Sequence, residues 1–63
     1  MHRTFYIVRL ESFDSAFMQM QICVECDSEI RAIYKGRRVG KYIFNDFNFK
    51  VEVIGEYHVD VKG

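Results

Sequence analysis

The chain contains no tryptophan and no proline, only two cysteines, and no formal net charge. The absence of proline excludes a Pro-rich linker, and two cysteines are too few for a network of disulfides. A neutral chain differs from a general polyanion-binding domain, whose isoelectric point usually lies above about 9. No apolar run is long enough to span a membrane. These absences favour a small water-soluble domain.

A length of 63 residues allows one domain, which we place over residues 1–63. A domain this small buries only about 60% of the surface that its unfolded chain exposes. Six phenylalanines and four tyrosines must therefore supply much of the core. Arg9 and Glu11 interrupt the apolar stretch that a secretory signal would need. We interpret Met1 as the start of an intracellular, cytoplasmic protein.

The C-terminal third has a hydrophobic period of two. Apolar residues take the odd positions and mostly polar residues the even ones, which is typical of extended chain with one apolar and one polar face. We expect a sheet in which the odd-numbered apolar residues share one buried face. These residues are Phe47, Phe49, Val51, Val53, Tyr57, Val59 and Val61.

Residues 4–26 form two further alternating stretches separated by a turn. The first stretch is partly apolar on both sides, which suits an inner strand, and the second is apolar mainly on one side. Pairing Leu10 with Ala16 and Val8 with Met18 brings the apolar sets together, whereas a slip of one residue would bury glutamines. We therefore predict a β-hairpin in this register.

The last third allows two arrangements. A loop at residues 54–56 and a turn at residues 45–46, which would place Tyr42 opposite Phe49, divide it into a three-stranded antiparallel meander. Alternatively, Gly55 marks a bend or bulge within one long strand. We expect the meander.

The segment between the hairpin and the last third has the features of a short helix. Asp27 is a suitable N-cap, and Ile30, Ile33 and Tyr34 have helical spacing. Acidic residues open the segment and basic residues close it, as the helix dipole favours. Gly36 is a candidate for its end.

These elements predict an α+β fold: a β-hairpin, one short α-helix, then a three-stranded antiparallel meander. The alternative makes residues 30–35 a strand, which would give a small all-β barrel of the SH3 or OB kind.

The second face of the hairpin carries a candidate protein-binding patch. In the predicted register it brings together Arg3, Phe5, Ile7, Arg9 and Phe17. Aromatic and arginine residues are enriched where proteins bind one another. The patch is available to a partner if the helix covers the other face, and is part of the core if the helix covers this one.

A basic segment is a candidate nucleic-acid site, because it combines cations for phosphates with tyrosines for stacking. The competing interpretation is a solvated helix end that collects bases. The segment contains Arg31, Tyr34, Lys35, Arg37, Arg38, Lys41 and Tyr42.

Metal binding and catalysis have little support in the sequence. Cys23 and Cys26 form a lone CxxC, and His2 and His58 do not match the spacing of a common zinc site. We expect two reduced structural cysteines, no metal and no cofactor. No nucleophile–His–acid order, Gly-rich phosphate loop or HExxH motif is present, so we do not expect an enzyme.

Three functions remain. The first is a small binding protein that occupies and modulates or inhibits a larger protein. In its short length, β-rich design and lack of catalytic groups, the chain resembles small phage-encoded inhibitors of host or defence factors. This resemblance rests on general features alone and assigns a function to no particular residue. The second is a nucleic-acid-binding module that uses residues 31–41 and Tyr42. The third is a homodimer whose pairing completes a small core.

Overall fold

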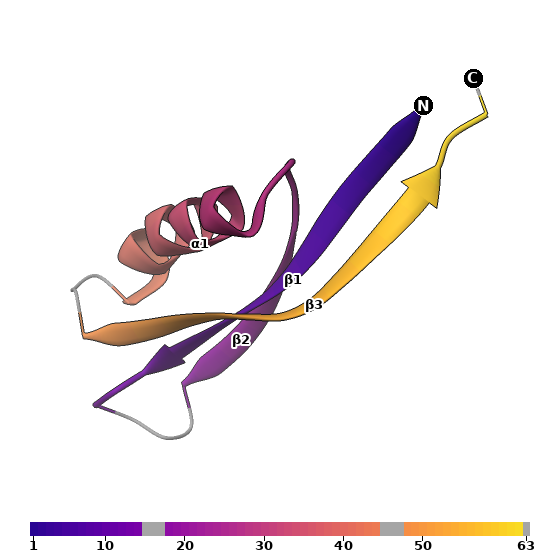
Figure 1. Ribbon diagram of the computed structural model, residues 1–63. Coiled ribbons are helices and arrows are strands. Elements are labelled where there is room, and N and C mark those ends of the chain that lie inside the picture. The colour runs from indigo at the N-terminus through magenta and orange to yellow at the C-terminus, as the bar shows by residue number, and fades with distance from the viewer. Residues whose placement is uncertain (15–17, 45–47, 63) are drawn as a thin grey trace.

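The structure is a computed structural model that describes residues 1–14, 18–44 and 48–62. It confirms the α+β class: an antiparallel sheet with one helix on one face, and no closed barrel (Figure 1). The described elements are β1 (His2–Ser12), β2 (Gln19–Glu25), α1 (Glu29–Phe44) and β3 (Phe49–Asp60).

The strand order is β2-β1-β3, so β1 is the inner strand that its two partly apolar sides predict. The β1–β2 hairpin is confirmed, but its predicted register is wrong by four residues. Leu10 lies opposite Met20 and Val8 opposite Ile22. Alternation alone cannot separate these registers, because a shift of four residues keeps every side chain on its face. The Ser12 amide donates to the Met18 carbonyl at 2.9 Å, which sets the actual register near the hairpin end.

The predicted meander is wrong, and the alternative of one long strand is right. The pairing with β1 passes from Val53 directly to Gly55, which leaves Ile54 as the extra residue of a β-bulge. The predicted turn at residues 45–46 lies outside the described residues, but Tyr42 belongs to α1 and does not pair with Phe49.

The bulge also corrects the expectation of one shared apolar face. Val51 lies opposite Leu10, on the side of the sheet that α1 covers. Val59 lies opposite Arg3, on the other side. One extra residue in a strand reverses the face of every residue after it, so odd numbers face α1 before Ile54 and face away after it. Phe47 lies outside the described residues.

The helix is confirmed but differs at both ends from its predicted bounds. It begins at Glu29, and its N-cap is Ser28 rather than Asp27, because the Ser28 hydroxyl accepts a hydrogen bond from the Arg31 amide at 3.3 Å. Gly36 does not end it; the helix continues to Phe44.

The core lies between α1 and the covered face of the sheet. Val8, Leu10 and Ala32 are fully buried, and Tyr6 is nearly so. Ala32, Gly36 and Gly40 are the buried residues of α1, spaced four apart on one side of the helix. Their small size lets the helix backbone approach the sheet closely. A Cβ on Gly36 would lie only 2.9 Å from Val51 Cγ1.

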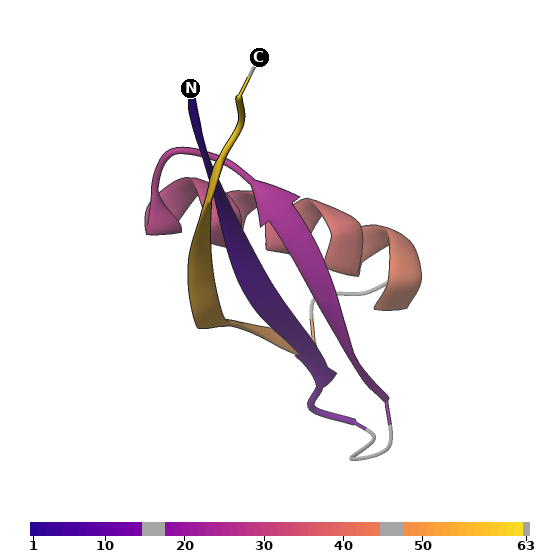
Figure 2. The ribbon, with the colours of Figure 1, turned by 90° about the vertical axis from the view of Figure 1, so that its right-hand side faces the viewer.

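The molecule is elongated, with extents of 43 × 17 × 16 Å. The start of β1 and the end of β3 run beyond α1 as a two-stranded ribbon that carries both termini (Figure 1). The view turned by 90° shows α1 lying across one face of the sheet while the other face is uncovered (Figure 2). This uncovered face is called the open face below.

Candidate functional site

The open face is built by the odd-numbered residues of β1 and by the residues opposite them. Phe5 lies between Glu25 of β2 and Tyr57 of β3, and Ile7 lies between Cys23 and Gly55. No element among the described residues packs over this face, since α1 lies on the opposite side (Figure 2).

An apolar strip runs along the open face, and we define it as Phe5, Ile7, Tyr57 and Val59. The rings of Phe5 and Tyr57 stack with their centroids 5.2 Å apart and their planes 12° from parallel. Tyr57 is 42% exposed and Val59 39% exposed. The Arg3 guanidinium lies 5.6 Å from the centre of the Phe5 ring, within range of a cation–π contact. The apolar strip therefore exposes Tyr57 and Val59 to solvent, while Phe5 and Ile7 are half-buried.

Two ion pairs border the apolar strip. Arg3 binds both carboxylate oxygens of Glu25 at 2.6 Å, and Arg9 binds Glu52 at 3.0 Å. Hydrogen bonds from the arginines are the main reason that the pKa values of Glu25 and Glu52 lie below their usual range. The same bond with Glu25 raises the pKa of Arg3. The side chains that border the strip are thus charged, but the charges within each pair balance.

The two cysteines lie in different surroundings. Cys23 is exposed on the open face, and its Sγ lies 3.1 Å from the Tyr57 hydroxyl. This hydrogen bond is the main reason that the pKa of Tyr57 is raised, and partial burial is the second. Cys26 is half-buried against the core and donates to the Ser28 carbonyl at 3.4 Å. Both thiols are free.

The structure brings four of the five predicted patch residues onto the open face: Arg3, Phe5, Ile7 and Arg9. Phe17 lies outside the described residues. Tyr57 and Val59 also lie on the open face, although the odd-numbered pattern predicted them on the buried face. The available signal was Gly55, because a glycine within an alternating strand marks a possible bulge.

The basic segment divides into two parts. Tyr34, Arg37, Arg38 and Lys41 line a groove of about 660 Å³ between α1 and β3. Residues that the sequence analysis did not connect with this segment complete the lining: Phe13, Phe49, Lys50 and Val51.

The other predicted nucleic-acid residues lie away from the groove. Arg31 pairs with Asp27 at 3.4 Å, and Lys35 donates to the Glu25 carbonyl at 2.8 Å. Tyr42 is 92% exposed and does not line the groove. The structure therefore does not gather the whole predicted set into one site.

No three His, Cys, Asp or Glu side chains of the described residues come together as metal ligands would. His58 instead contacts Glu56 at 2.8 Å and Thr4 at 3.0 Å on the ribbon. No helix within the described ranges has the length and apolar character required to cross a membrane. Comparisons with protein-family models, curated proteins and solved structures find no match to this chain.

Proposed function

We propose that the chain is a cytoplasmic, non-enzymatic binding protein that occupies a surface on a larger protein and thereby modulates or inhibits it. The apolar strip on the open face carries this proposal. It presents the exposed Tyr57 ring, stacked on the half-buried Phe5 ring, on the side of the sheet that α1 leaves uncovered.

The composition of the open face fits a protein partner. Interfaces between proteins have an apolar and aromatic centre surrounded by a polar rim. Here the centre is the apolar strip, and the rim consists of the Arg3–Glu25 and Arg9–Glu52 pairs. Because these charges are already balanced within the chain, the face is suited to an apolar depression with polar edges rather than to a polyanion.

The chain supplies a matched pair of variants for the test. Tyr57→Ala removes an aromatic ring from the apolar strip, and Tyr42→Ala removes the same ring from the exposed side of α1. Truncation of a central aromatic residue at an interface costs about 2 kcal/mol or more, which is about 30-fold in affinity. We therefore expect Tyr57→Ala to lose the partner and Tyr42→Ala to keep it.

The experiment is affinity capture from a nuclease-treated lysate of the native host, with circular dichroism to show that each variant is folded. The supporting result is a protein retained by the wild type and by Tyr42→Ala but lost with Tyr57→Ala. Equal retention by all three excludes the apolar strip as the binding surface.

A second copy of the chain is the competing occupant of the open face. In that case the purified protein would be a dimer by light scattering, its melting temperature would rise with concentration, and Tyr57→Ala would make it monomeric. That set of results would replace the proposal of a larger partner with the homodimer.

A further inference from the structure

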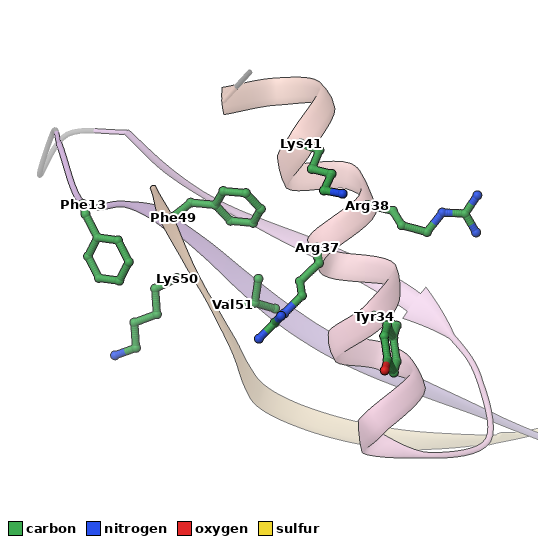
Figure 3. A pocket seen from close by; sticks show the side chains of 8 residues that line it. All are labelled: Phe13, Tyr34, Arg37, Arg38, Lys41, Phe49, Lys50 and Val51. Carbon is green, nitrogen blue, oxygen red and sulfur yellow. The ribbon is translucent and has the colours of Figure 1, made fainter. Parts of the chain in front are cut away.

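The groove between α1 and β3 lies on the helix side of the sheet, opposite the apolar strip. The turn that ends β1 contributes to it, because the Phe13 amide donates to the Asn48 carbonyl at 3.0 Å. Figure 3 shows the Phe49 ring between β3 and α1, and Arg37 reaching from the helix toward Val51. Phe13 and Lys50 lie on the β3 side.

Among the described residues, the charged side chains that line the groove are all positive. Arg37, Arg38 and Lys41 come from α1 and Lys50 from β3, and none of the described residues that line the groove is acidic. Lys50 has a carboxylate neighbour, Glu52, at 3.4 Å. Arg37 and Arg38 have no ion-pair partner within the described parts of the chain. Three cations of α1 thus lie along one concave surface in a chain whose net charge is zero, while the Lys50 ammonium points away from α1 (Figure 3).

The groove also has aromatic rings available for stacking. Phe13 is 69% exposed on one side and Tyr34 is 67% exposed on the other. An exposed phenylalanine is costly to leave in water, and aromatic rings beside cations are the combination with which proteins hold unpaired bases and their phosphates.

We propose that this groove binds single-stranded nucleic acid. Arg37 and Arg38 neutralise phosphates, and Tyr34 and Phe13 stack on bases. A single strand fits these residues better than a duplex, because stacking on exposed rings needs base faces that a duplex keeps within its own stack. The site is separate from the apolar strip, so loss of either function leaves the other intact.

The salt dependence of binding measures how many phosphates are neutralised. For single strands, the slope of log K against log salt is about −0.7 for each phosphate neutralised. The slope is about −1.4 if only Arg37 and Arg38 take phosphates and about −2.1 if Lys41 takes one as well. Between 50 and 200 mM salt, affinity should fall about 7-fold in the first case and about 18-fold in the second.

The test is fluorescence anisotropy with a labelled twelve-nucleotide oligothymidylate and a DNA duplex of the same length. We expect the single strand to bind more tightly than the duplex. Arg37→Ala/Arg38→Ala should reduce the slope by about 1.4. Arg31→Ala/Lys35→Ala, which removes the same charge from the same helix outside the groove, should leave the slope unchanged.

A matched pair of tyrosine variants tests stacking. Tyr34→Ala should weaken binding at least about fivefold, whereas Tyr42→Ala should not change it. The proposal is overturned if no binding is measurable at 50 mM salt, if the duplex binds more tightly, or if the two double variants weaken binding equally. The last result would mean that any positive charge on α1 contributes equally to binding, whether or not it lines the groove.

Discussion

The close approach of α1 to β3 makes Gly40 the most sensitive position for a small substitution. A Cβ at residue 40 would lie 2.6 Å from Cζ and 2.9 Å from Cδ2 of Phe49, and would also meet Cε2. These separations are shorter than real Cβ contacts, so either the Phe49 ring or the helix must move in Gly40→Ala. The ring is held in place by stacking on Phe44, with centroids 5.4 Å apart.

Two opposing effects determine the stability of Gly40→Ala. Alanine favours a helix over glycine by about 1 kcal/mol. Overpacking a core contact costs about 1–3 kcal/mol. We expect a net loss of roughly 0–2 kcal/mol, which lowers the melting temperature by about 4–8 °C for each kcal/mol in a domain of this size.

A double-mutant cycle with Phe49→Leu measures most of the clash, because leucine lacks the Cε2 and Cζ atoms that lie nearest to the new Cβ and keeps only the Cδ atoms. In that background Gly40→Ala should be close to neutral or stabilising by up to about 1 kcal/mol. Comparing Arg38→Ala with Arg38→Gly, at an exposed position of the same helix, measures the propensity difference directly. Urea denaturation of these variants provides the free energies of unfolding. The reasoning is refuted if Gly40→Ala stabilises the wild type as much as it stabilises the Phe49→Leu variant.

Two further predictions concern the core and the ion pairs. Leu10→Ala removes a fully buried side chain from β1 and should lower the free energy of unfolding by about 2–5 kcal/mol, which is a large part of the roughly 3–9 kcal/mol expected for a domain of this length. A loss below about 1 kcal/mol in urea denaturation would contradict the packing described. Because the pKa values of Glu25 and Glu52 are lowered in the folded chain, their contribution to stability is complete above the usual carboxyl pKa and is lost as the pH falls through the lowered values. The double variant Glu25→Gln/Glu52→Gln should therefore lose less stability between pH 6 and pH 3 than the wild type. The control is Glu11→Gln, which should behave like the wild type because the Glu11 side chain has no ion pair with the described residues. Equal loss in all three proteins would show that the two pairs do not determine acid stability.

The separate strands were predictable because their side chains alternate. The two partly apolar sides of β1 identified it as the inner strand, and parity assigned the facing residues of the hairpin correctly. The hairpin register was not predictable to the residue, since Leu10 paired with Ala16 or with Met20 gives the same two faces. Local pattern therefore determines which side a residue takes but not which partner it meets.

The glycines of α1 are the reason that its C-terminal end was predicted too early. Glycine is common at helix ends, but in the tertiary structure Gly36 lies within the helix and packs against Val8 and Val51. The spacing of Ala32, Gly36 and Gly40 was the available signal, because small residues four apart line one side of a helix. The groove could not be predicted from the sequence, since Phe13 and Lys50 line the same groove as Tyr34 only when β3 pairs with β1.

The pattern of side chains along the chain was enough to predict the α+β class, the inner position of β1 and the common face of Arg3, Phe5, Ile7 and Arg9. That Tyr57 and Val59 join this face, and that α1 leaves it open, became known from the folded chain. The cause is the bulge at Ile54, because one extra residue in the strand reverses the direction of each side chain that follows it.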